Sequence, residues 1–89
     1  MTEHHLKCWP EPFQAMWDGR KTFEFRKDDR GYQVGDVLHL REYEPDDALY
    51  TDRQMWWRVT YVLREGFGVP EGYCVMGISA ISPGGKMSP

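Results

Sequence analysis

The chain has 89 residues and a formal net charge of −3, and its four Phe, four Trp and five Tyr side chains are as numerous as its Leu, Ile and Val together. This length allows one domain with a single core and excludes a two-domain enzyme. The acidic balance argues against a protein that coats nucleic acid through bulk charge, and the lack of any apolar run of about 20 residues predicts a soluble cytoplasmic protein that does not enter a membrane.

The first predicted elements are a strand over residues 6–9 and a short helix over residues 10–18. The helix begins at Pro10, and Gly19 follows it as the stop signal. Phe13, Met16 and Trp17 recur at helical spacing, so we expect them to face the core.

A short strand is predicted over residues 22–26, where polar and aromatic side chains alternate. Phe23 and Phe25 would form an apolar underside that packs into the core. Glu24 and Arg26 would share the charged upper face, about 7 Å apart.

Three further strands are predicted by the alternation of apolar and polar residues. The first covers residues 36–43, and an acidic hairpin loop over residues 44–52 follows it. The second covers residues 54–64 and bears apolar rings, among them Tyr61, on its core face. A glycine-rich loop then leads to a closing strand over residues 73–81.

One helix is too few for a doubly wound sheet, so the order of elements predicts an α+β, mainly β domain. A small mixed β-barrel of about five strands, with one short helix after the first strand, would also remove exposed sheet edges. We expect a single domain over residues 1–81. Residues 82–89 (SPGGKMSP) are predicted to be a flexible C-terminal tail.

The cysteines and histidines give little indication of a metal. Cys8 and Cys74 match no CxxC spacing and are expected to be buried thiols. His4, His5 and Cys8 form a cluster that resembles metal ligands, but no second ligand pair accompanies it. We therefore expect no metal and no cofactor.

The segment from Gly19 to Arg26, GRKTFEFR, is the densest in chemistry-bearing residues. Lys21 would begin its strand near the helix C-terminus, whose carbonyls favour a cation. From pattern alone, Glu24 and Arg26 form either an ordinary solvated ion pair or part of a charged cleft.

GRKTFEFR resembles the G-x-K-x-x-E-x-R signature of the ASCH family, whose domain is a PUA-like β-barrel with a helix beside a charged cleft. The resemblance covers roughly residues 4–81 and is greatest to compact phage and bacterial ASCH-related proteins. Its flanking features are the aromatic helix, Val34-Gly35-Asp36, Arg41-Glu42-Tyr43, Thr60-Tyr61-Val62-Leu63 and the strand from Gly72-Tyr73.

The resemblance implies an RNA- or nucleotide-binding cleft centred on Lys21, Glu24 and Arg26. Lysine and arginine meet phosphate, and a carboxylate accepts from a base amino group. Arg58 and Trp56 would add a cation and a stacking surface if their face of the long strand lines the cleft; otherwise Trp56 is buried. Trp9 and Tyr43 are the other rings without a predicted packing role.

An enzymatic branch of the family hydrolyses N4-acetylcytidine with a lysine, a threonine and a glutamate. Lys21 matches the lysine, but Glu24 replaces the threonine, and neither Glu65 nor Glu71 can be fixed as the distal glutamate. If the protein is an enzyme, an amidohydrolase or a ribonuclease, Lys21 and Glu24 are its candidate catalytic residues.

A monomeric module that binds RNA or a modified nucleotide is therefore the leading hypothesis, ahead of a small hydrolase. A third hypothesis is a phage or mobile-element protein that binds a host protein through its acidic loop. Five acids and no base lie between Glu42 and Asp52. Such a run is more often simply solvated than a mimic of nucleic acid.

Overall fold

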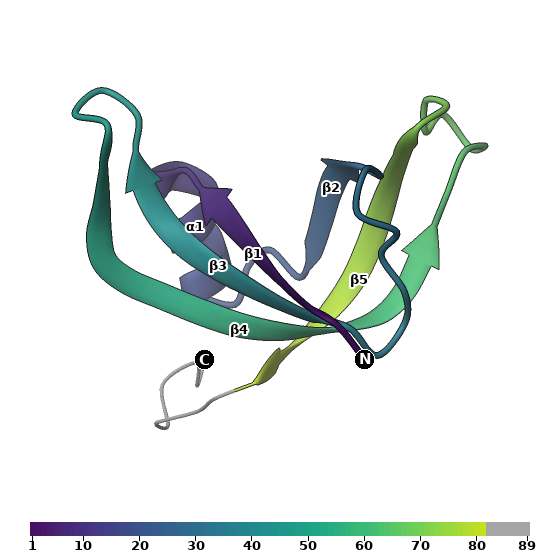
Figure 1. Ribbon diagram of the computed structural model, residues 1–89, viewed down its shortest axis with the longest axis horizontal. Helices are drawn as coiled ribbons and strands as arrows, with labels where there is room; N and C mark the ends of the chain where they lie inside the picture. The colour runs from purple at the N-terminus through teal and green to yellow at the C-terminus, as the bar shows by residue number, and fades with distance from the viewer. Residues whose placement is uncertain (82–89) are drawn as a thin grey trace.

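The computed structural model describes residues 1–81 and contains the predicted elements in the predicted order (Figure 1). The predicted tail over residues 82–89 lies outside the described residues. Within residues 1–81 no helix is long and apolar enough to cross a membrane. The elements are β1 (Glu3–Cys8), α1 (Pro10–Trp17), β2 (Phe23–Lys27), β3 (Val37–Glu44), β4 (Leu49–Leu63) and β5 (Tyr73–Ile81). The first strand thus begins three residues earlier than predicted, and β4 begins inside the stretch predicted to be a hairpin loop, which is reduced to residues 45–48.

The five strands form one mixed sheet in the order β1-β3-β4-β5-β2. β1 runs parallel to β3, and the other neighbours are antiparallel. The strands curl into an open U, with β1 and β2 as the two edges (Figure 1). The prediction of a closed barrel is therefore wrong in this respect: the sheet is a half-barrel, and no β1–β2 ladder joins its edges.

Arginine side chains connect the two edges where a strand ladder would have closed a barrel; we call this gap the seam. Arg26 on β2 donates to the carbonyl of Lys7 over 2.7 Å, and Arg30 donates to the carbonyl of His5 over 3.2 Å. Alternate carbonyls of an edge strand face away from the sheet and need partners. The two arginines thus cap the free edge of β1.

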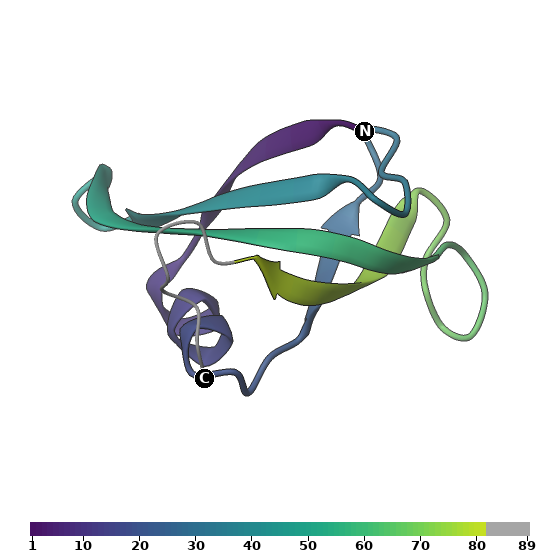
Figure 2. The ribbon, with the colours of Figure 1, turned by 90° about the horizontal axis from the view of Figure 1, so that it is seen from below.

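The core lies on the inner side of the curl, where α1 packs (Figure 2). Pro10 begins the helix, and Phe13 and Met16 on one face of it are fully buried, as their spacing predicted. Rings and sulfur side chains contribute much of the rest. The buried apolar residues are Leu6, Cys8, Phe13, Met16, Tyr32, Leu38, Leu40, Met55, Trp57, Val59, Cys74, Met76 and Ile78.

Three aromatic residues expected in the core are exposed instead. Phe23 and Phe25 are 47% and 51% exposed, because β2 turns Glu24 toward the inside of the curl. Tyr61 is 63% exposed, and a bulge shifts the β4–β5 register between Val59 and Tyr61. One extra residue reverses the direction of every side chain after it.

A partly buried ion pair anchors α1 to the sheet. Arg53 on β4 donates to both carboxylate oxygens of Glu42 on β3, over 3.1 and 3.0 Å, and also to Gln14 on the helix. Its guanidinium lies 5.0 Å from the ring centres of Phe13 and Trp17. The hydrogen bonds from Arg53, more than any other influence, lower the pKa of Glu42.

A second buried carboxylate, Asp36, ties the N-terminus to the loop before β3. It accepts from the backbone N–H groups of Thr2 and Gln33 and lies 2.8 Å from His4 Nε2. Burial alone would raise the pKa of Asp36, but the hydrogen bonds from His4, Thr2 and Gln33 together outweigh it and lower the pKa.

Stability should therefore fall when the protein is acidified. The folded-state pKa values of Glu42 and Asp36 lie below their unfolded values of about 4, so the stability they contribute is present above that pH and is lost as the pH falls through the folded pKa values. We expect the melting temperature, followed by circular dichroism, to drop between pH 5 and pH 3. Glu42→Gln and Asp36→Asn should each flatten that slope; an unchanged slope in both variants would contradict the assignment.

Candidate functional site

The turn at the end of α1 fixes the position of Lys21. Gly19 has a φ of 82°, in the left-handed region that favours glycine, and its N–H donates to the carbonyl of Met16. The backbone N–H of Lys21 then donates to the carbonyl of Ala15. The turn thus delivers Lys21 directly to the start of β2.

The structure brings Lys21, Glu24 and Arg26 together, as the GRKTFEFR pattern predicted. Glu24 is only 5% exposed. One of its carboxylate oxygens accepts from Lys21 Nζ over 2.9 Å, and the other accepts from Arg26 Nε over 2.6 Å. A single buried carboxylate therefore holds two cations in place.

The cations retain unused hydrogen-bond donors. The ammonium of Lys21 also donates to the carbonyl of Phe23 over 2.8 Å, rather than to the helix carbonyls that we expected to hold it. Arg26 uses one further N–H on the carbonyl of Lys7. Since an ammonium has three donors and a guanidinium five, both groups have N–H donors without partners among residues 1–81.

A cavity of about 460 Å³ opens beside this cluster, between the end of β1 and the free edge of β2. Three cations, Lys21, Arg26 and Lys27, and one anion, Glu24, are among the side chains that line it. Lys7 also borders the cavity, although its ammonium lies over the ring of Tyr43, 4.2 Å from the ring centre. The wall is therefore positive in a chain whose net charge is negative.

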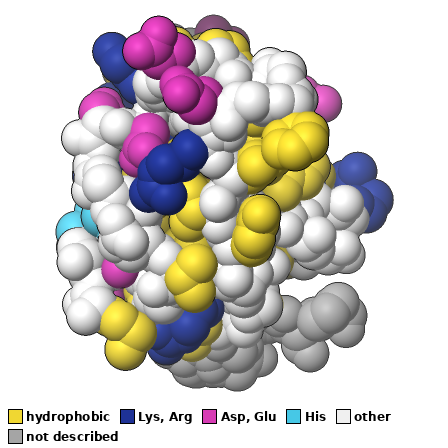
Figure 3. Space-filling view, turned by 90° about the vertical axis from the view of Figure 1, so that its right-hand side faces the viewer, with side chains coloured by type: hydrophobic (Ala, Val, Ile, Leu, Met, Phe, Trp, Pro, Cys, Tyr) yellow, Lys and Arg dark blue, Asp and Glu magenta, His cyan; other side chains and the backbone are white. Residues whose placement is uncertain are grey.

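Aromatic rings surround the cations. Trp9, Phe23 and Phe25 line the cavity and are 60%, 47% and 51% exposed. Phe25 stacks on Tyr73 of β5, with ring centres 5.6 Å apart. Figure 3 shows hydrophobic side chains gathered on the side of the molecule that carries β5, with positive side chains beside them. Exposed rings next to cations are typical of surfaces that stack on planar ligands.

Cys8 also lines the cavity, but its thiol is poorly suited to attack a substrate. Burial, followed by the charge of Glu24, raises the pKa of Cys8 to about 11. Since the thiolate is the nucleophilic form, Cys8 is an inert part of the wall at neutral pH.

Arg58 and Trp56 do not line this cavity. Both lie on the outer face of β4, away from the core face that carries Trp57. Arg58 donates to the carbonyl of Gly35 over 2.8 Å, and Trp56 stacks on His39 with ring centres 4.5 Å apart. The outer face of the long strand therefore contributes nothing to the cavity at the seam.

The sequence reasoning did not place Trp9, Lys27 or the Lys7 carbonyl at this site. The sequence did offer a signal for Trp9: a large ring directly before the proline that starts the helix lies between two elements, where binding residues often occur. The Lys7 carbonyl had none, since only the curl of the sheet brings β1 to β2. Lys27 follows Arg26 directly on β2, but alternation would place it on the opposite face of the strand. Glu65 and Glu71, considered as distal catalytic acids, do not line the cavity.

The fold and the cavity define a small, β-rich half-barrel protein with a cationic, ring-lined site at its open seam. The chain belongs to the family described as "Domain of unknown function (DUF3850)", whose sequence profile matches residues 3–78. It is also similar to "Uncharacterized 12.9 kDa protein in GpA 3'region" of Escherichia phage P2, with 37% identity over 59 residues. That match covers 66% of this chain and 52% of the phage protein, so the chain spans about half the length of the relative.

Proposed function

We propose that this protein binds single-stranded RNA or a nucleotide in the cavity at the seam. One observation carries the proposal: a buried carboxylate, Glu24, fixes two cations with unused donors inside a cavity bordered by exposed rings. The combination of cation, carboxylate and ring matches the phosphate, base edge and base face of a nucleotide.

Each part of such a ligand has a partner in the cavity. Lys21 and Arg26 are positioned to donate to one or two phosphate groups. Trp9 and Phe25 offer ring faces on which a base stacks, a contact worth about 1 to 3 kcal/mol per base. Glu24 is the acceptor for an exocyclic amino group once the ligand draws one of the cations toward its phosphate.

The proposal includes the finer family assignment, membership of the ASCH group with a PUA-like fold. Two features support it: the charged residues of GRKTFEFR converge on a cavity, and a helix lies beside that cavity. The open seam is the feature that departs from a barrel.

Binding alone is favoured over hydrolysis by the local chemistry. Glu24, the candidate base, is buried and holds Lys21 with one oxygen and Arg26 with the other, so its role in this arrangement is to position the two cations. The raised pKa of Cys8 removes the other candidate nucleophile in the wall. The acidic-loop hypothesis also loses support, because Glu42 at the start of that run is buried and paired with Arg53.

Replacing Lys21 with alanine should weaken RNA binding about tenfold or more. The variant loses a charge-assisted hydrogen bond to phosphate, worth about 1.5 to 3 kcal/mol. The measurement is fluorescence anisotropy with a labelled single-stranded RNA of mixed sequence, together with titration of free nucleotides. With about two phosphates contacted, the slope of log affinity against log salt concentration should be about −1.4.

Arg20→Ala is the matched control, because it removes one positive charge at the neighbouring residue. The Arg20 side chain is exposed, pairs with Asp18 and does not line the cavity. It should bind as the wild type does. Equal affinity in Lys21→Ala and the wild type, or no binding by either protein, would refute the proposal.

A further inference from the structure

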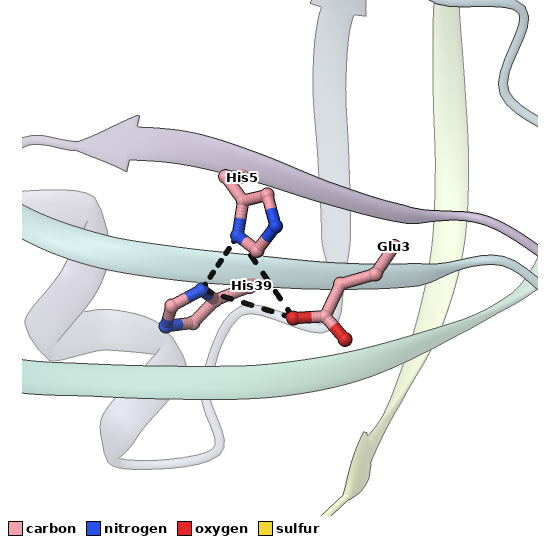
Figure 4. Close-up of side chains that lie close together, drawn as sticks. All are labelled: Glu3, His5 and His39. Atoms are coloured by element: carbon pink, nitrogen blue, oxygen red, sulfur yellow. Dashed lines mark hydrogen bonds and ion pairs between the residues drawn. The ribbon is translucent and has the colours of Figure 1, made fainter.

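We propose a second site, on the outer face of the sheet, that binds a divalent transition-metal ion such as Zn²⁺ through Glu3, His5 and His39. The nearest ligand atoms of the three side chains lie within 4.8 Å of one another. Figure 4 shows both imidazoles and the carboxylate turned toward a common point. Two imidazoles and one carboxylate are a ligand set that suits zinc and its neighbours and leaves a position open for water.

The parallel pairing of β1 and β3 creates the cluster. His5 and His39 are direct partners in the register of the two strands, so their side chains stand side by side on one face. Glu3 shares that face, because it precedes His5 by two residues. His4 points to the opposite face, where it is buried against Asp36, and Cys8 is buried as well. The N-terminal cluster suggested by the sequence is thus divided, and only His5 of it reaches this site.

The surroundings of His39 direct its Nδ1 toward the other two ligands. Its Nε2 lies 2.6 Å from Oε1 of Gln54, an atom that can only accept, so Nε2 carries the proton. Its Nδ1 then accepts a hydrogen bond from Nδ1 of His5 in the metal-free protein. An ion that binds both Nδ1 atoms would displace that proton from His5. Trp56 stacks flat on the ring, with an interplanar angle of 5°, and fixes its orientation. A hydrogen-bond acceptor on the far nitrogen is the usual support of a metal-bound histidine.

The distances are close to those of a coordinated ion. The two Nδ1 atoms are 2.9 Å apart, and each lies 3.9 Å from Oε2 of Glu3. Four ligands at about 2.0 to 2.2 Å from zinc stand roughly 3.3 to 3.6 Å apart in a tetrahedron. Adjustments of about half an ångström therefore suffice, and the exposed side chains of Glu3 and His5, 46% and 66% accessible, are free to make them.

The site is independent of the proposed nucleotide cavity. Glu3, His5 and His39 do not line that cavity, which opens beside Cys8 and Glu24. A metal ion here would therefore bind whether or not RNA does.

Titration of tag-free protein with Zn²⁺, in competition with a chromophoric chelator, tests the inference. We expect one ion per chain, and binding at least tenfold weaker in His5→Asn and in Glu3→Gln. Replacement of Gln54 by alanine should weaken binding about tenfold, because it removes the partner that orients His39. Co²⁺ should give visible absorption bands in the wild type that disappear in His5→Asn.

Glu11→Gln, which removes an exposed carboxylate outside the cluster, is the matched control and should bind Zn²⁺ as the wild type does. The variants at Glu3, His5 and Gln54 all change exposed side chains. Unchanged circular dichroism spectra will show that they fold. Binding of more than one ion with equal affinity in wild type and variants would overturn the inference, as would the absence of binding in the wild type.

Discussion

Replacing Arg53 with methionine should lower the free energy of unfolding by about 2 to 3 kcal/mol. The variant keeps the length of the side chain but leaves the carboxylate of Glu42 buried beneath α1 without its cation. Breaking a buried ion pair on one side costs about 3 to 5 kcal/mol, and we place this pair lower because about a third of the Arg53 side chain is exposed. Urea unfolding followed by tryptophan fluorescence measures the loss.

Two further variants separate charge from geometry. Arg53→Lys keeps the charge but cannot donate to both oxygens of Glu42, so it should lie between the wild type and Arg53→Met. Adding Glu42→Gln to Arg53→Met should recover part of the lost stability, since it removes the unpaired charge. If the double variant is less stable than Arg53→Met alone, the uncompensated carboxylate is not the cause.

Replacing Glu24 with glutamine should change the affinities for a nucleotide and for inorganic phosphate in opposite directions. The change removes one negative charge from the wall of the cavity, so phosphate alone should bind more tightly. A nucleotide should bind about tenfold less tightly, because its base amino group loses a charged acceptor that inorganic phosphate does not use. Isothermal titration calorimetry with cytidine monophosphate and with phosphate measures both.

Glu71→Gln provides the control, because it makes the same charge change at an exposed residue that does not line the cavity. Tighter binding of both ligands by Glu24→Gln would mean that the cavity is a simple anion site without base recognition.

The elements of this fold follow from local patterns that the sequence displays. Pro10 and Gly19 bound the helix, and alternation located β3 and the later part of β4. The closure of the sheet did not follow, because it depends on whether β1 and β2 meet, and no local pattern encodes that pairing. The bulge near Tyr61 was hidden because Tyr61 and Leu63 continue the apolar alternation of the first part of β4, although Val62, not Tyr61, packs against the core.

The centre of the site was predictable because a two-residue period places Glu24 and Arg26 on one strand face, and the helix stop places Lys21 beside them. Which face of β2 points toward the core was not predictable from the sequence. The alternation predicted that Phe23 and Phe25 would be buried, whereas the structure buries Glu24 instead. Two cations offset the cost of burying one carboxylate, and that compensation becomes visible only when the three side chains are seen in contact.

Arg26, one of the two arginines at the seam, links the cavity to the edge of the sheet. Arg26 holds Glu24 with one N–H and the exposed edge of β1 with another, so the same guanidinium serves the cavity and the joint between the two arms of the sheet. Under the proposed function, a ligand that draws Arg26 toward its phosphate would release the carbonyl of Lys7 and loosen that joint. Occupancy of the cavity would then be recorded as faster hydrogen exchange along β1.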